Sequence, residues 1–237
     1  MKNGSVYAVK LKKAYAKFRP TVTVAEIPEP DDVLHQLAVG IFAEGSGIND
    51  GRRAVRRALA KMVDWNEMRV STAVELNKAT GNTVSQGTNR SQMLIDALGA
   101  IYALENQLSI AHLRFLGRRE ARRYLENLKG VGAYATASVI LWCLDGHAIP
   151  VDDRLWESLK QEGLVAPDAS REEVQAFLER NISAADAKTF CLVMQSFASS
   201  KRAAPKRPKA SKPETKIARA RNHTSSTARK RATSRSK

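Results

Sequence analysis

The sequence has few cysteines and no long apolar run. These two features argue against a disulfide-linked protein, a cysteine-bound metal site and a membrane-spanning helix. Its two cysteines, Cys143 and Cys191, stand inside apolar helical patterns and belong to no metal-ligand or disulfide spacing. No apolar run reaches the roughly 18 residues that suggest a membrane-spanning helix. No secretory signal is visible in the first fifteen residues either. Buried free thiols favour a reducing compartment, so a cytoplasmic protein is expected.

The net charge of +15 gathers at one end of the chain. From Lys201 onward there are fourteen Lys and Arg against one Glu, so that of the 39 basic and 24 acidic residues the first 200 positions hold 25 and 23. The body is nearly neutral, and its charge alone does not indicate a nucleic-acid-binding fold. Residues 200–237 are almost free of apolar side chains, which predicts a disordered basic tail. That tail either lies along phosphates or serves only solubility or localisation.

Apolar residues recur at helical spacing through most of the body, which predicts an all-α fold. Residues 1–30 read as a polar or helical lead-in ending in Ile27-Pro28-Glu29-Pro30. Strand-like alternation is weak and confined to Thr21–Val24, while Ser170 and Glu173 match a capping box. Helices are expected from Asp31 or Asp32 to Phe42, from near Asn49, and over 71–79, 89–104, 109–115, 118–128, 133–144, 153–161, 171–180 and 184–198.

The most informative stretch is a pair of glycines between two expected helices. Leu128-Lys129-Gly130-Val131-Gly132 follows a basic amphipathic helix and precedes an apolar one that begins at Ala133. Two glycines leave the backbone open to a ligand, and the free amides at the start of a helix bind anions such as DNA phosphates. The alternative is a helix corner in which the glycines serve packing only.

With Thr136-Ala137 and Val151-Asp152 further on, this stretch resembles the helix-hairpin-helix DNA glycosylases of the endonuclease III superfamily. In that family the catalytic aspartate lies 18 residues after a pocket position, which here pairs Asp152 with Tyr134. The resemblance extends from about residue 31 to 198 and is strongest over 124–160. It implies two helical lobes that flank a cleft, residues 31–146 with the hairpin and 147–199 with the aspartate. Residues 1–30 would pack with the second lobe.

The resemblance gives Asp152 and Tyr134 catalytic roles. Asp152 would stabilise the sugar cation that forms as the base leaves, and would orient or deprotonate a water. Lyase-competent members carry a lysine at the position of Tyr134, and a phenol cannot form a Schiff base, so the monofunctional branch is expected. Asp152 could instead be a simple N-cap, with Asp153 as its competitor, and Tyr134 could be a core aromatic.

Three features depart from the family pattern. The C-terminal four-cysteine motif for an iron–sulfur cluster is missing, so no cofactor is expected, although the resemblance allows a monovalent cation at the hairpin. The helix-end loop that inserts a side chain into the DNA stack is Phe42–Ser46 here, and a wedge role for Glu44 is doubtful because phosphates would repel it. Arg154 stands where the family usually has histidine.

The resemblance therefore implies a monofunctional DNA N-glycosylase of base excision repair. Its partner would be duplex DNA with a damaged or mismatched base, bound by a monomer in the nucleoid or, in a eukaryote, the nucleus. A non-catalytic DNA-binding protein and a bifunctional glycosylase/AP lyase remain alternatives. The expected DNA-binding residues are the hairpin with the first residue of the following helix, and three arginines of an earlier helix. They are Lys129, Gly130, Val131, Gly132, Ala133, Arg52, Arg53 and Arg56.

Overall fold

The structure is a computed structural model, and it describes residues 4–21 and 32–203, which belong to one compact unit. Every regular element in these two ranges is a helix, so the predicted all-α class is confirmed. Within them no helix is both long enough and apolar enough to cross a bilayer. The predicted tail beyond Ala203 and Val22–Val24 of the weak strand pattern lie outside the described residues.

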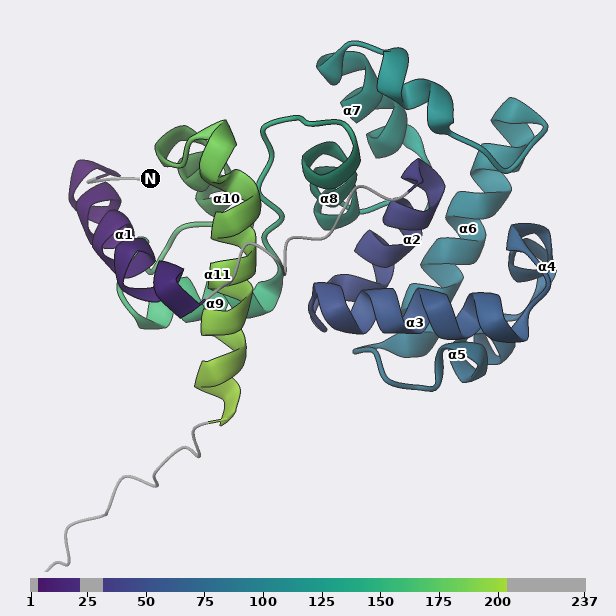
Figure 1. The fold of residues 1–237 in the computed structure, drawn as a ribbon, viewed down its shortest axis with the longest axis horizontal. Coiled ribbons are helices and arrows are strands. Elements are labelled where there is room, and N and C mark those ends of the chain that lie inside the picture. The colour runs from purple at the N-terminus through teal and green to yellow at the C-terminus, as the bar shows by residue number, and fades with distance from the viewer. Residues whose placement is uncertain (1–3, 22–31, 204–237) are drawn as a thin grey trace, which may run out of the picture. The chain divides into compact units, whose positions relative to one another are not determined.

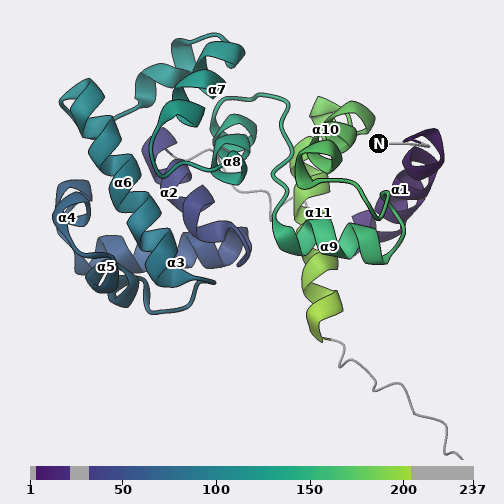
Figure 2. The ribbon, with the colours of Figure 1, turned by 180° about the vertical axis from the view of Figure 1, so that it is seen from behind.

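Two groups of helices can be followed in Figures 1 and 2. The first group runs from α2 to α8, and the second contains α1, α9, α10 and α11. The bounds of the first group are α2 (Val33–Ala43), α3 (Ile48–Lys61), α4 (Trp65–Val70), α5 (Ala73–Thr80), α6 (Gly87–Glu105), η3 (Ala111–Phe115), α7 (Arg118–Asn127) and α8 (Ala133–Cys143). Those of the second are α1 (Gly4–Phe18), the short η1 (Arg19–Thr21), α9 (Asp153–Gln161), α10 (Arg171–Asn181) and α11 (Ala184–Ala203).

Helix α2 is the centre of the first group and is buried on every side. Ten of its eleven residues are buried, as all-round apolar composition requires. It can approach α3 and α8 closely because glycines stand at both contacts. A Cβ on Gly51 of α3 would lie 2.6 Å from the Val39 carbonyl oxygen, and one on Gly40 would lie 3.1 Å from the Cα of Ala135.

The second group brings the two ends of the described chain together. Tyr15 of α1 packs edge-on against Phe190 of α11 with ring centroids 5.3 Å apart, and Phe18 packs against Phe197 at 4.9 Å. The N-terminal segment therefore contacts α11 although they are far apart in sequence. Aromatic pairs of this kind add to the stabilisation that burial itself provides.

Local signals set most helix starts. The Asp32 side chain accepts from the N–H groups of Leu34 and His35 at the start of α2. The predicted capping box of Ser170 and Glu173 is present at α10. The sequence analysis did not anticipate helix α4, which begins after its N-cap Asp64.

Candidate active site

The loop Glu44–Gly47 connects α2 to α3 and carries backbone groups into the site. Gly45 and Gly47 have φ angles of 75° and 103°, a region that favours glycine, so the loop can turn sharply here. The hydroxyl of Ser46 accepts a hydrogen bond of 2.7 Å from the N–H of Ser85 and ties the loop to the segment before α6. The loop is thus fixed to its own group of helices.

Asp152 lies where the two groups of helices meet. It is the N-cap of α9, where one oxygen, Oδ1, accepts from the N–H of Leu155 at 2.8 Å. The other oxygen, Oδ2, accepts from the N–H of Gly45 at 3.0 Å, from the loop of the first group. The residue is 8% exposed. Capping and chemistry are therefore compatible, because one oxygen caps the helix while the carboxylate still lines a pocket.

The next residue, Asp153, lies outside the pocket and contacts Arg171. Its side chain is exposed and its Oδ1 lies 3.3 Å from Nη1 of Arg171 on α10. It is not among the residues that line the pocket with Asp152. The geometry favours Asp152 over Asp153 as the carboxylate that meets a substrate.

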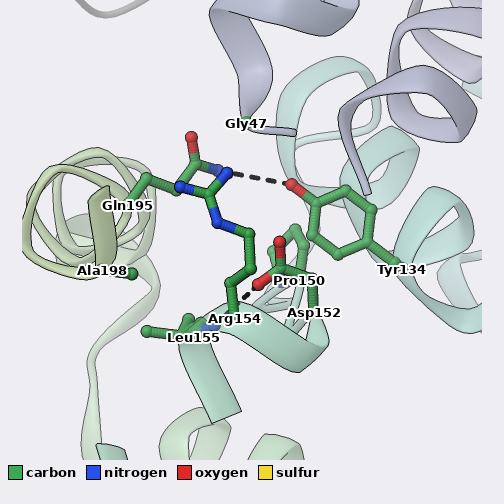
Figure 3. Close-up of a pocket in the computed structure, with 8 residues that line it drawn as sticks. All are labelled: Gly47, Tyr134, Pro150, Asp152, Arg154, Leu155, Gln195 and Ala198. Carbon is green, nitrogen blue, oxygen red and sulfur yellow. Dashed lines mark hydrogen bonds between the residues drawn. The ribbon is translucent and has the colours of Figure 1, made fainter. Parts of the chain in front are cut away.

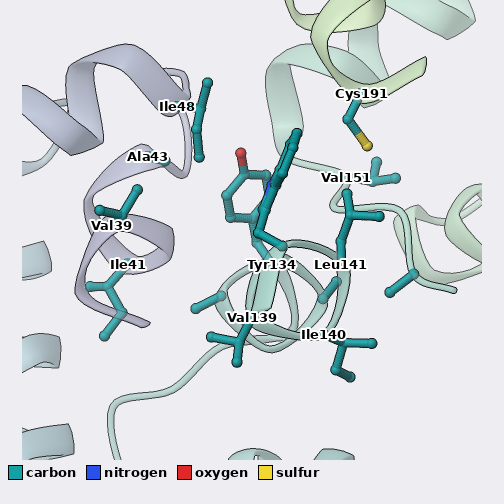
Figure 4. Packing of buried hydrophobic residues seen from close by; sticks show 14 of the residues in the cluster. Val39, Ile41, Ala43, Ile48, Tyr134, Val139, Ile140, Leu141, Val151 and Cys191 are labelled. Carbon is teal, nitrogen blue, oxygen red and sulfur yellow. The ribbon is translucent and has the colours of Figure 1, made fainter. Parts of the chain in front are cut away.

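Tyr134, on the first turn of α8, brings its hydroxyl to the same pocket while its ring belongs to the core. The ring is buried in the apolar cluster, between Ala43 and Ile48 on one side and Val151 and Cys191 on the other (Figure 4). The hydroxyl oxygen accepts from Nε2 of Gln195 at 3.4 Å, while Oε1 of Gln195 accepts from the N–H of Ile48. Burial, and then the nearby Asp152 carboxylate, raise the pKa of Tyr134 well above its ordinary value, so it stays a neutral phenol.

The pocket itself is small and bordered by residues from both groups (Figure 3). Its cavity of about 10 Å³ is close to the space that one water needs. Two larger grooves of about 540 and 510 Å³ adjoin it, sharing Gly47 and Gln195 on one side and Arg154 on the other. The lining residues are Gly47, Tyr134, Pro150, Asp152, Arg154, Leu155, Gln195 and Ala198.

Glu44, the residue at the expected wedge position, is engaged by two arginines. Its Oε2 lies 2.6 Å from Nη1 of Arg90 on α6, and its Oε1 lies 3.2 Å from Nη1 of Arg171 on α10. Its side chain is only 13% exposed. In this conformation Glu44 links the two helical groups, and we call Glu44, Arg90 and Arg171 the interlobe ion cluster.

The hairpin lies between α7 and α8, next to this cluster. Gly130 has a φ of 85°, and a Cβ on it would lie 2.1 Å from the carbonyl oxygen of Met93 in α6. Gly132 is the N-cap of α8, and its nearest neighbour would be Oε2 of Glu44 at 3.8 Å. The two glycines therefore differ. The side of Gly130 that would carry a Cβ faces α6, so its lack of a side chain serves packing there, whereas the same side of Gly132 is open; contact of either glycine with DNA stays a prediction.

The other predicted DNA-binding residues are spread over two surfaces. At the hairpin, Val131 is half-buried, Ala133 is exposed, and Lys129 is largely exposed with Nζ 3.3 Å from Oδ1 of Asp96. On α3, Arg53 pairs with Asp50 and lines a groove that adjoins the pocket. Arg56 of α3 is exposed and Arg52 is half-buried. Their contact with DNA stays a prediction.

The cysteines do not fit an iron–sulfur cluster. Such clusters take four cysteine thiolates, and this chain has two. Cys143 on α8 and Cys191 on α11 are buried and form no disulfide. In the described ranges no three His, Cys, Asp or Glu side chains are grouped so that they could hold a metal ion. The prediction that no cofactor is needed remains a prediction.

Sequence reasoning missed Gln195, Arg90 and Arg171 as residues of the site. Gln195 lies 61 positions from its partner Tyr134, and Arg171 lies 127 positions from Glu44. Neither belongs to a local motif. The one available signal was a polar residue, Gln195, within the apolar pattern of the last helix.

The sequence is similar to that of a curated protein over part of its length. No family model matches the chain. An Arabidopsis thaliana protein named as a putative DNA glycosylase is 24% identical over 157 residues, covering 65% of this chain and 52% of that protein. The chain thus spans about half the length of this curated relative.

Solved structures resemble the chain over most of its length. A non-covalent endonuclease III–DNA complex has a TM-score of 0.61 at 18% identity and covers 90% of this chain and 91% of that one. An H. pylori 3-methyladenine DNA glycosylase has a TM-score of 0.60 at 14% identity, covering 82% and 98%. A Clostridium acetobutylicum 8-oxoguanine glycosylase/lyase with DNA has 0.61 at 18%, covering 81% and 66%. The chain therefore has the fold of these DNA glycosylase structures, and the predicted resemblance in fold is confirmed.

Proposed function

We propose that this chain is a DNA glycosylase of the monofunctional type, which hydrolyses the N-glycosidic bond of a damaged or mismatched base. The observation that carries the proposal is the pocket with Asp152 and Tyr134 side by side. Asp152 is held at both oxygens in a water-poor setting. A fixed carboxylate there stabilises the positive charge that develops on the sugar as the base departs.

A base inside a duplex cannot reach this pocket, so the target nucleotide must rotate out of the stack. The cost of unstacking is lowest for a mispaired or damaged base. The free amides at the start of α8 and the exposed Lys129 would hold the DNA backbone at the hairpin. These contacts position the duplex but read no sequence.

Hydrolysis is favoured over lyase chemistry because Tyr134 offers no amine. A lyase needs a nucleophilic amine that forms an imine with the sugar. Among the described residues no lysine lines the pocket. The relatives include a glycosylase/lyase and a 3-methyladenine glycosylase, so the fold serves more than one chemistry.

The test is base release from duplexes that each carry one lesion, measured with and without alkali. We expect strand breaks only after alkali, because hydrolysis leaves an intact abasic sugar. Asp152→Asn should lower the single-turnover rate by about 10²–10³-fold, the usual cost of losing one such electrostatic contact. Its affinity for the duplex should be nearly unchanged.

Asp153→Asn is the matched control, because it removes the same charge one residue away and outside the pocket. It should keep most of the activity. A panel without any released base, with duplex binding retained, would favour the non-catalytic binding protein. Loss of activity in Asp153→Asn alone would move the catalytic role to that residue.

A further inference from the structure

Arg154 places a positive charge inside the pocket. It is the second residue of α9, two positions after Asp152, and its Nη1 donates to the carbonyl oxygen of Gly45 at 3.3 Å. Figure 3 shows its side chain extending from α9 toward Tyr134 and Gln195. Arg154, Tyr134 and Gln195 line the cavity together with Asp152.

The charge of Arg154 acts on the groups of the pocket. Burial is the largest cause that raises the pKa of Tyr134, Asp152 and Glu44 add to it, and the Arg154 guanidinium opposes them. The two other arginines nearby, Arg90 and Arg171, are paired with Glu44. Of the eight residues that line the pocket, Arg154 is the basic one. An entering base would therefore meet its positive charge.

The cavity between these residues is small. About 10 Å³ leaves space for one water and not for a base. A base therefore enters only when a side chain of the lining moves. Arg154 has the longest and most flexible side chain among the lining residues. Its planar guanidinium carries several N–H donors, which can form hydrogen bonds with carbonyl oxygens of the base.

We propose that Arg154 binds the flipped base and selects neutral bases with carbonyl groups, the uracil and thymine class, over cationic alkylated purines. This inference rests on the proposed function. A neutral base leaves as an anion, whose charge the guanidinium stabilises by charge-assisted hydrogen bonds. A methylated purine is already positive, so the same guanidinium repels it in the ground state and gives no help as it leaves neutral.

The reaction balances without a further reactant. The C1′–N bond breaks and its electron pair goes to the base nitrogen, next to Arg154. Water attacks C1′ and gives a proton to Asp152, which releases it to solvent, and the base anion takes up a proton from solvent to leave as the free base. Asp152 thus serves the sugar, while Arg154 serves the leaving group.

The experiment measures single-turnover release of a series of 5-substituted uracils that differ in the acidity of N1, and of 7-methylguanine and 3-methyladenine. Wild type should release the uracils, with a rate that depends weakly on N1 acidity. Arg154→Gln should slow them by about 100-fold, in line with the loss of an oxyanion donor. The dependence on N1 acidity should become steeper, which a purely structural role would not produce.

Two further variants serve as controls. Arg154→Lys keeps the charge and should recover part of the rate. Lys160→Gln removes a positive charge from the same helix outside the pocket, where Lys160 lies over the Trp156 ring, and should behave as wild type. Thermal unfolding and duplex affinity of each variant show that the fold is retained.

The inference is overturned if Arg154→Gln leaves the rate and the N1 dependence unchanged, or if it slows both classes of base equally. It is also overturned if wild type releases only the methylated purines, although the proposed function would then stand. Weaker binding to every duplex at an unchanged single-turnover rate would make Arg154 a phosphate contact. Release of neither class would refute this inference, whereas the glycosylase proposal is refuted only when every other lesion duplex of the panel is also left intact.

Discussion

The two hairpin glycines should respond differently to the same substitution, although they are two residues apart. Gly130→Ala places a Cβ 2.1 Å from the Met93 carbonyl oxygen and 3.0 Å from the Ala97 nitrogen, both in the backbone of α6. The φ of 85° adds strain for any L side chain. Gly132 has a φ of −90°, and its new Cβ would meet nothing closer than 3.8 Å.

The magnitudes follow from these distances. A left-handed alanine costs about 1–2 kcal/mol, and forcing atoms into a packed interior costs about 1–3 kcal/mol more. Gly130→Ala should therefore lower the free energy of unfolding by about 2–5 kcal/mol, out of a total of about 5–15 kcal/mol. For a protein of this size the Tm would fall by about 4–20 °C. Gly132→Ala replaces one uncharged N-cap by a poorer one and should cost less than about 1 kcal/mol.

Denaturant unfolding and duplex affinity, measured on both variants, test this reasoning. Gly132→Ala should keep its stability and bind every duplex more weakly, because its methyl group stands beside the amides that start α8. Equal stability losses in the two variants would refute the assignment of Gly130 to packing. So would a Gly130→Ala protein as stable as the wild type.

Three other results are expected. Glu44→Gln should lower the free energy of unfolding by about 1–3 kcal/mol, since it leaves Arg90 and Arg171 without their shared carboxylate. It should also raise the affinity for undamaged duplex, and weaker binding would mean that Glu44 itself contacts DNA. Borohydride should trap no covalent adduct with lesion duplex, because Tyr134 cannot form an imine; efficient trapping would point to a lysine nucleophile, with Lys129 the first to replace. A chain ending at Ala203, where α11 ends, should bind undamaged duplex with a flatter salt dependence than the full chain, because it lacks twelve Lys and Arg; equal slopes would exclude the tail as a DNA contact.

Local sequence patterns were sufficient for most helices, whereas Asp152 and Tyr134 were singled out by the resemblance to the glycosylase family. The start of α9 at Asp153 was predicted because Asp152 is a strong N-cap, and α8 was placed because glycines precede a wholly apolar run. The end of α11 was less well placed. For α11 the apolar pattern fades while the helix continues to Ala203, and helix ends depend on tertiary support more than on composition.

The remaining parts of the site depend on contacts between distant positions. The N–H of Gly45 reaches Asp152 across 107 positions, and it is a backbone group that carries no side-chain signal. Gly130 was expected to face a ligand, because a glycine in a hairpin pattern does not show whether its open side meets DNA or a neighbouring helix. The position of α6 decides this, and that position follows from the packing of the whole first group.

The two hydrogen bonds of Asp152 couple the orientation of its carboxylate to the contact between the two groups of helices. One comes from the start of α9 and the other from the loop after α2, so the carboxylate is fully held only when both groups are in contact. A protein whose groups moved apart on an ordinary stretch of duplex would lose the Gly45 N–H and would let water reach the carboxylate. Its most reactive group would then be misoriented during the search along intact DNA. Under the proposed function this arrangement would act as a safeguard, with full reactivity only when both groups close around an extruded nucleotide.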